Sequence, residues 1–300
     1  MTDVFEQIER IDGVATRKDE LLSLHTSLGV GGPCGIMVWV SNMEALREVL
    51  ALSIKHTLPA TVLGAGSNVL VRDGGISGIV IRLVDEFTKI EVSGERIRAG
   101  AGASLGDVVS KATSGGIGGL EFLAGIPGTI GGAAVVNAGS KDVWVSDRLV
   151  ELKVLTGEIS EVKLTSKDLS FGYRYSSIGR DWVVTEVTLA GHGCPVEDAR
   201  RRVEEYLDMR GATQPAGQQT AGCIFKNPPD DAAGRLIEQA GLKGFRIGGA
   251  EVSTLHANWI VNTGGATARE ILDLIAEIQT KVKSKYGTDL ELEVSVIGQD

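Results

Sequence analysis

The sequence predicts an α+β protein, because runs with the two-residue period of strands and runs with the 3.6-residue period of helices occur in separate groups. Strand-like runs rich in β-branched residues lie at 79–83, 89–92, 96–99, 149–155, 159–164 and 182–189. Helix-like runs lie at 41–56, 105–113, 195–210, 232–240 and 267–286. The chain has 300 residues, of which 43% are hydrophobic, so it can bury a large core and divide into two or three domains.

The first part of the chain begins with an amphipathic lead-in over residues 1–24 and a strand over 36–40. Ser41 and Glu44 then have the spacing of a capping box, which predicts the start of the helix that reaches residue 56. The middle of the chain is mostly sheet.

A domain boundary is expected near residue 200. The charged stretch 195–210 is a predicted helix, and the Gly-, Gln- and Pro-rich stretch 211–219 that follows is typical of a hinge. Beyond the hinge, strands are expected at 223–226, 259–262 and 290–297. We therefore expect residues 1–200 to hold a cofactor, with a subdivision near residue 84, and residues 201–300 to form a separate lobe.

The charge and the cysteines restrict the function. The net charge of −9 argues against nucleic acid or an anionic membrane as the main partner. The acidic N-terminus does not have the features of a signal peptide, and every long apolar run is interrupted, so we expect a cytoplasmic protein without membrane insertion. Three widely separated cysteines without a CxxC motif predict neither a disulfide framework nor a metal site.

Two glycine-rich segments predict a dinucleotide cofactor. Gly64-Ala-Gly-Ser-Asn68 follows a short apolar run, and the segment 118–139 places apolar residues between its glycines. Glycine lets the backbone approach a ligand closely and adopt φ > 0, so that N–H groups can point at phosphate oxygens. A Rossmann fingerprint is excluded because Val69 stands where its third glycine is required. A purely structural turn is an even alternative for the first segment alone.

Three polar side chains are candidates for chemistry. Arg174, in the expected extended segment 171–176, lies on the side opposite the aromatic residues and is either a surface arginine or a ligand for a substrate carboxylate. Cys223 is either a small buried hydrophobe or an acid, since an ordinary thiol with a pKa of about 8.5 is mostly protonated at neutral pH. Glu293 shares the polar face of the expected strand 290–297 with Glu291 and Ser295.

A set of short motifs, taken in order, resembles one enzyme family. The motifs are Gly64-Ala-Gly-Ser-Asn68, Gly125-Ile-Pro-Gly-Thr129, Asn137-Ala-Gly139, Tyr173-Arg-Tyr-Ser176, Gly222-Cys-Ile-Phe-Lys-Asn-Pro228, Ala240-Gly-Leu-Lys-Gly244, His256-Ala-Asn258 and Leu290-Glu-Leu-Glu-Val294. Together they resemble the UDP-N-acetylenolpyruvoylglucosamine reductases, in the short subtype that lacks an extra tyrosine loop. The resemblance implies a two-subdomain FAD-binding fold of the vanillyl-alcohol-oxidase type and a C-terminal substrate-binding domain.

The resemblance also implies a reaction. NADPH reduces non-covalently bound FAD, flavin N5 gives a hydride to C3 of UDP-N-acetylglucosamine enolpyruvate, and Cys223 protonates C2 to give UDP-N-acetylmuramate, a peptidoglycan precursor. Arg174 and Glu293 stabilise the developing enol. The implied substrate contacts are Tyr173, Lys226, Asn227, Lys243 and His256. The implied cofactor contacts are Gly64, Ala65, Gly66, Ser67, Asn68, Gly125, Ile126, Pro127, Gly128, Thr129, Gly131, Asn137 and Gly139, and the protein is expected to be a monomer.

The sequence departs from the family pattern in three places. One is Ser140-Lys-Asp142, where the family commonly has a turn like Ala-Tyr-Gly. Cys223 stands where the family usually has serine, and nearby cations could lower a thiol's pKa and weaken it as an acid. The stretch 25–33 lacks the basic residue that the family often has near Gly29. Two other functions stay open: a flavin oxidase on the same scaffold, which would differ in its C-terminal lobe, and a nucleotide-sugar-binding regulator, which would need neither flavin nor Cys223.

Overall fold

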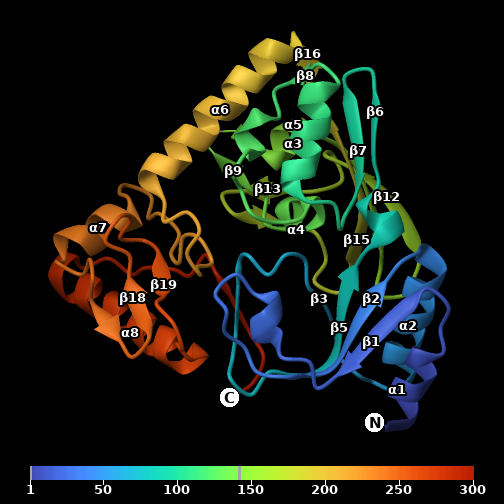
Figure 1. The fold of residues 1–300 in the computed structure, drawn as a ribbon, viewed down its shortest axis with the longest axis horizontal. Helices are drawn as coiled ribbons and strands as arrows, with labels where there is room; N and C mark the ends of the chain where they lie inside the picture. Colours follow the sequence, from blue (N-terminus) through green and yellow to red (C-terminus); the bar gives the residue numbers. More distant parts are fainter. Residues whose placement is uncertain (1, 141–142) are drawn as a thin grey trace. The chain divides into compact units, whose positions relative to one another are not determined.

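The computed structural model describes residues 2–140 and 143–300, and these residues divide into two compact units (Figure 1). Residues 141–142 of the stretch Ser140-Lys-Asp142 lie outside the residues that the structure describes. Unit 1 contains residues 1–18, 36–64 and 78–209, and unit 2 contains 19–35, 65–77 and 210–300. Unit 2 thus takes two segments from the first part of the chain, a division that the linear boundary near residue 200 did not anticipate.

Unit 1 is built around two sheets. The first has the strand order β1-β2-β5-β3, in which β1–β2 is antiparallel and β3–β5 is parallel. Its elements are α1 (Thr2–Glu9), β1 (Val14–Lys18), β2 (Cys34–Val40), α2 (Met43–Lys55), β3 (Ala60–Val62) and β5 (Ile76–Leu83). β5 is buried on both faces, since Ile79, Val80 and Ile81 have no exposed surface, and α2 lies beside this sheet (Figure 1).

The second sheet of unit 1 has the order β12-β11-β15-β7-β6, and all four neighbouring pairs are antiparallel. Its strands are β6 (Ile90–Ser93), β7 (Arg96–Gly100), β11 (Leu149–Leu155), β12 (Glu161–Thr165) and β15 (Val183–Ala190), and they confirm the strands expected in the middle of the chain. The accompanying helices are α3 (Leu105–Ser114), α4 (Ile130–Val135), α5 (Val145–Arg148) and α6 (Val196–Thr213).

Short elements complete unit 1. Three two-residue pairs join β8 (Ile117–Gly118) to β16 (His192–Gly193), β9 (Gly139–Ser140) to β10 (Val143–Trp144), and β13 (Phe171–Gly172) to β14 (Tyr175–Ser176). Single 3₁₀ turns lie at Asp85–Thr88 and Glu121–Leu123.

Unit 2 packs two helices and a small sheet around its own core. The sheet has the order β17-β18-β19, with β17 (Arg246–Ile247), β18 (Ala250–Val252) and β19 (Ile260–Asn262). The helices are α7 (Ala233–Gln239) and α8 (Ala268–Tyr286), a 3₁₀ turn lies at Leu22–His25, and β4 (Val69–Val71) pairs in parallel with β20 (Ser295–Ile297). α8 lies beside β17 and β18 (Figure 1), and its apolar residues belong to this core.

The ends of α8 follow from its sequence. Thr267 and Glu270 form a capping box at its start, and Gly287 adopts φ 72° after its end. Ile271, Leu274 and Ile278 recur at helical spacing and are buried, which confirms the helix expected from the pattern.

Local differences from the expected elements have identifiable causes. Asn42, not Ser41, caps α2, because its side chain accepts the N–H of Ala45 while the Ser41 hydroxyl donates to Gly13 O. The stretch 223–226 is extended but makes only isolated bridges, and 290–297 is a regular strand only over Ser295–Ile297.

Candidate functional site

Gly64, the first residue of the first glycine segment, meets the second glycine segment within unit 1, whereas residues 65–68 belong to unit 2. A Cβ atom on Gly64 would lie 2.7 Å from Thr129 Oγ1, so only glycine lets the first turn approach the second segment this closely. Gly66 has φ 66°, and a Cβ there would lie 2.1 Å from His25 O. The first turn therefore depends on glycine for both conformation and space.

Several backbone groups of the second segment form hydrogen bonds within the protein. Thr129 caps α4, and the N–H groups of Ile130 and Gly131 donate to Ala103 O and Ala101 O. A Cβ on Gly131 would lie 2.7 Å from Ala101 Cβ, so this glycine serves close packing. Within Gly125–Thr129, the positive φ of Gly125 and Gly128 (72° and 152°) forms the expected bend.

Arg82 is a neighbour of the first turn that sequence reasoning missed. Its Nη2 atom donates to Gly64 O at 3.0 Å, and burial lowers the pKa of its guanidinium. Burial of a cation costs free energy, and an anion nearby offsets that cost. The signal in the sequence that could have identified Arg82 was a single charged residue in the otherwise apolar strand Ile79–Leu83.

Asn137 has a structural task in unit 1. Its side chain is buried, with Nδ2 donating to Gly172 O at 3.0 Å and Oδ1 accepting the N–H of Ser146 at 3.0 Å. Gly139 has a similar role, because a Cβ on it would lie 2.3 Å from Trp144 Cε3. Both residues are predicted to contact the cofactor, and in the structure both support the segments that surround Arg174.

Arg174 occupies the turn of a β-hairpin, so the expected extended segment 171–176 is wrong. β13 and β14 pair antiparallel, and Arg174 adopts φ 54° between them. The guanidinium Cζ lies 5.4 Å from the ring centroids of both Trp144 and Tyr173, so it faces the aromatic rings that it was expected to avoid. The Ser176 hydroxyl donates to Val135 O at 2.6 Å, and this hydrogen bond links the hairpin to α4. The rings and these bonds hold a cation in a defined place.

Cys223 lies on the central one of three extended segments in unit 2. On one side, Cys223 forms a bridge with Trp259. On the other side, the N–H of Glu293 donates to Ile224 O at 2.8 Å. A Cβ on Gly222, the residue before Cys223, would have no atom within 4 Å. The thiol and the carboxylate that the sequence singled out thus belong to neighbouring segments of one unit.

The remaining expected substrate residues also lie in unit 2. Asn227 Oδ1 accepts the N–H of Ala233 at the start of α7. Lys226 and Lys243 pair with Glu291 and Glu238 at 3.5 Å and 2.7 Å, and both carboxylate partners are well exposed. Exposed ion pairs contribute little to stability, so these lysines can exchange their partners for an anionic ligand.

His256 is held as a neutral imidazole. Burial lowers its pKa from the ordinary 6.5, and the charge of Lys243 acts in the same direction. Its Nδ1 atom accepts the N–H of Asn258 at 3.2 Å, which leaves the proton on Nε2. Nε2 can therefore donate to a ligand at neutral pH.

Comparison with known proteins decides the family. The model of the "UDP-N-acetylenolpyruvoylglucosamine reductase, C-terminal domain" matches residues 214–297, and that of the "FAD binding domain" matches residues 35–164. UDP-N-acetylenolpyruvoylglucosamine reductase 2 of Symbiobacterium thermophilum is 40% identical over 100% of this chain and 98% of its own length. The chain belongs to the UDP-N-acetylenolpyruvoylglucosamine reductase family.

Further relatives agree with this assignment. The Bacillus subtilis reductase is 37% identical over 99% of both chains. The crystal structure of the Thermus caldophilus reductase superposes with a TM-score of 0.82 at 38% identity, covering 94% of this chain and 98% of that chain. The FAD-binding fold and C-terminal domain expected from the resemblance are confirmed, and the chain is an FAD-dependent oxidoreductase of this reductase family.

The residues of unit 1 fit the FAD that this reductase family uses. Gly64 leaves room where any side chain would collide with Thr129, and Arg82 beside it supplies a partly buried positive charge. FAD carries a diphosphate, which suits a narrow backbone turn with a cation next to it. Arg82 and Gly64 are thus the part of unit 1 best suited to the diphosphate.

The neutral state of His256 makes the stability of this family member pH-dependent. Because its folded pKa lies below 6.5, the unfolded chain binds a proton that the folded chain does not. As far as His256 contributes, the free energy of unfolding is highest above pH 6.5 and falls as the pH drops through the folded pKa. We expect the free energy of unfolding in urea to fall more between pH 7.5 and 5.5 for the wild type than for His256→Gln. Equal losses in both proteins would contradict this.

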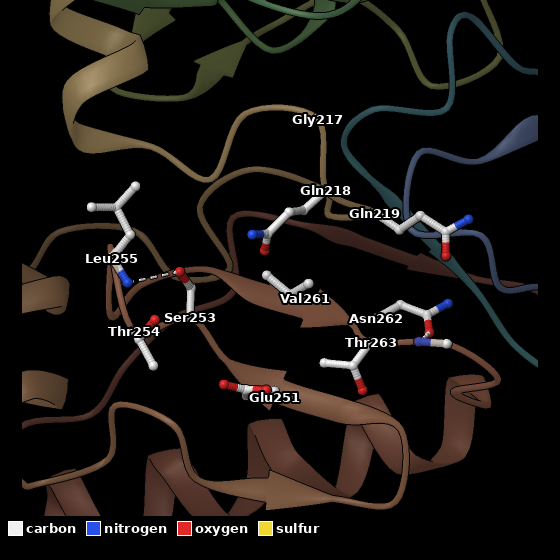
Figure 2. A pocket seen from close by; sticks show the side chains of 11 residues that line it. Gly217, Gln218, Gln219, Glu251, Ser253, Thr254, Leu255, Val261, Asn262 and Thr263 are labelled. Atoms are coloured by element: carbon white, nitrogen blue, oxygen red, sulfur yellow. Dashed lines mark hydrogen bonds between the residues drawn. The ribbon is translucent and has the colours of Figure 1, made fainter.

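A separate pocket of about 500 Å³ lies in unit 2 on one face of β18 and β19 (Figure 2). Figure 2 shows the side chains of Glu251 and Val261 within it and Gln218 across from them. Among the described lining residues Glu251 is the one ionisable group, and it pairs with Arg246. None of the residues predicted from the reductase motifs lines this pocket, and its described lining residues include no basic side chain to bind a diphosphate.

No helix in the part of the chain that the structure describes is long and apolar enough to cross a membrane.

Proposed function

We propose that the chain catalyses the NADPH-dependent reduction of UDP-N-acetylglucosamine enolpyruvate to UDP-N-acetylmuramate, in the synthesis of peptidoglycan precursors. The observation that carries the proposal is the pairing of the Cys223 segment with the Glu293 segment in unit 2. It brings a proton donor and a carboxylate onto adjacent extended segments.

Each residue of the proposed centre has a task suited to its chemistry. Bound FAD supplies the hydride for C3 of the enolpyruvyl group. Cys223 gives its thiol proton to C2 and regains a proton from solvent. Glu293 polarises the enol as charge develops, and Arg174 pairs with the substrate carboxylate through its planar guanidinium.

The rings around Arg174 prepare it for that task. Trp144 and Tyr173 keep the guanidinium in one place, and Asn137 holds the backbone of the hairpin. An arginine that is already ordered loses less conformational entropy when it binds a carboxylate. We propose that the edge of Tyr173 also contacts the substrate.

The basic residues of unit 2 are proposed to bind the nucleotide part of the substrate. Lys226 and Lys243 supply charge to the diphosphate, and Nε2–H of neutral His256 supplies a hydrogen bond. Asn227 holds the start of α7 with its Oδ1 atom, and its side chain is proposed to contact the sugar. These cations are needed because the chain as a whole carries a net charge of −9.

Arg82 provides a test of the cofactor site. We expect Arg82→Gln to weaken FAD binding by about 10- to 100-fold, because a charged hydrogen bond contributes about 1.5–3 kcal/mol. The dissociation constant is measured by the quenching of flavin fluorescence. Arg96→Gln, which removes an exposed arginine of β7 in the same unit, is the matched control and should bind FAD as the wild type does. Equal affinity in both variants would place the diphosphate elsewhere.

The proposed function is tested with the purified protein. The protein should show the absorbance spectrum of FAD, lose it when NADPH is added without oxygen, and recover it when the enolpyruvyl substrate follows. Recovery with oxygen but not with the enolpyruvyl substrate would indicate an oxidase. A protein that takes up no flavin would support a nucleotide-sugar-binding regulator.

We also propose a cytoplasmic location and a monomeric state, both of which rest on the sequence. Light scattering of the purified protein tests the second, and a dimer mass would contradict it.

A further inference from the structure

Ser27 joins the first glycine turn to the segment that carries Cys223. Its backbone N–H donates to Gly66 O at 3.0 Å. Its hydroxyl donates to Thr220 O at 2.6 Å, across 193 positions of sequence, and Thr220 lies three residues before Cys223. All of these residues belong to unit 2.

The hydrogen bond of the Ser27 hydroxyl can be removed while the hydrogen bond of its backbone N–H is kept. Ser27 has one hydroxyl hydrogen, and the 2.6 Å contact to Thr220 O takes it in preference to the 3.3 Å contact to Gly66 O. Replacement of the side chain leaves the N–H bond to the turn in place. Ser27→Ala therefore removes the hydroxyl bond to the Cys223 segment and keeps the N–H bond that anchors the glycine turn.

The surroundings of Ser27 keep both sides of this connection in place. Leu28 is fully buried in the core of unit 2, and Asn262 Nδ2 donates to its carbonyl at 2.9 Å. On the other segment, the N–H of Asn262 donates to Gln219 O at 2.9 Å. Asn262 thus holds the backbone on both sides of the short contact between Ser27 and Thr220.

Asn68 makes a second connection from the same turn. Its Nδ2 atom donates to Glu293 O at 3.3 Å, and its carbonyl accepts the N–H of Ser295 at 3.0 Å. The turn therefore contacts the segment of Cys223 through Ser27 and the segment of Glu293 directly. Asn68 was expected to serve the cofactor alone.

We propose that Ser27 is a positioning residue that sets the place of the Cys223 thiol relative to the flavin-binding turn. The proposal rests on the proposed function, in which Cys223 delivers a proton to a carbon that has received a hydride. Proton transfer requires the donor within hydrogen-bond reach, and a displacement of about 1 Å can cost about 10²-fold in rate. Ser27 itself takes no part in the proton transfer and affects its rate only through the position of the Cys223 thiol.

The test compares the two half-reactions of the FAD-loaded protein in rapid-mixing experiments. We expect Ser27→Ala to slow oxidation of the reduced flavin by the enolpyruvyl substrate at least about 10-fold. Flavin reduction by NADPH and FAD affinity should stay within about 2-fold of the wild type, because the N–H of Ser27 still holds Gly66 O. The loss should appear in kcat with KM little changed.

Two variants separate positioning from a general loss of stability. Ser27→Thr keeps the hydroxyl and should restore most of the rate. Ser41→Ala deletes a comparable bond, from Ser41 Oγ to Gly13 O at 2.8 Å, in unit 1, and should leave both half-reactions unchanged. Loss of FAD by Ser27→Ala, equal slowing of both half-reactions, or failure of Ser27→Thr to recover would overturn the proposal.

A second measurement does not depend on the proposed reaction. In a Cys194→Ala background, Cys223 is the thiol that iodoacetamide should modify, because Cys34 is buried and its pKa is raised to about 11, mainly by that burial. We expect Ser27→Ala to change the rate of Cys223 alkylation at least about 3-fold, as the released segment alters access to the thiol. Unchanged alkylation would overturn the positioning role. A changed rate in a protein that fails to use the enolpyruvyl substrate would uphold it and reject the proposed function.

Discussion

Cys223→Ala is expected to slow the oxidation of reduced flavin by the enolpyruvyl substrate by about 10²- to 10⁴-fold, the usual contribution of a positioned acid. Flavin reduction by NADPH should be unchanged, since that half-reaction requires no proton from the thiol. Stopped-flow absorbance of the flavin measures both steps on one sample.

Two controls accompany this variant. Cys223→Ser keeps a hydroxyl that can deliver a proton and should remain active. Cys194→Ala removes a thiol of unit 1, outside the segments that carry the proposed centre, and should change neither half-reaction. Equal loss in both halves for Cys223→Ala would show that the thiol supports the structure or the flavin and does not act as the acid.

Arg174→Ala is expected to lower kcat for the enolpyruvyl substrate by about 10²- to 10³-fold, the effect of removing one electrostatic contact from a developing negative charge. The half-buried guanidinium also packs on Trp144 and Tyr173, but a cation–π contact contributes only about 0.5–2 kcal/mol to stability. The variant should therefore fold and bind FAD. Steady-state kinetics with a flavin-content measurement tests both points.

Arg174→Lys provides the informative comparison, because lysine keeps the charge but cannot bind a carboxylate with two parallel hydrogen bonds. Its rate should lie between those of the wild type and Arg174→Ala. Arg180→Ala, which removes an exposed arginine shortly after the same hairpin, should behave as the wild type. A wild-type kcat for Arg174→Ala would exclude this residue from the reaction.

Local sequence patterns were sufficient to predict most helices and strands of the chain. The strand Leu149–Leu155 and the helix Ala268–Tyr286 were predicted to within one residue, because burial of one face imposes a period that the sequence displays. The order of the short motifs was sufficient to identify the family. Neither kind of signal depends on contacts between distant parts of the chain.

The hairpin around Arg174 shows where local patterns fail. Alternation of Phe171, Tyr173 and Tyr175 is typical of an extended strand, yet the chain reverses at Tyr173 and Arg174. The reversal requires φ 54° at an arginine, which is unfavourable for a residue with a Cβ. The bonds of Asn137 to Gly172 and of Ser176 to Val135 hold this conformation, and they join positions 35 and 41 residues apart.

The sequence by itself determined the fold class, the helices and strands, the glycine turns, and the identity of Cys223, Arg174 and Glu293 as candidates. The tertiary structure alone decided that residues 19–35 and 65–77 join residues 210–300 in one unit. It also decided that Arg82 lies beside Gly64, and that Ser27 and Asn68 connect the first turn to the segments of Cys223 and Glu293. These facts depend on hydrogen bonds and close packing between segments that are distant in sequence, and local periodicity carries no information about such pairs.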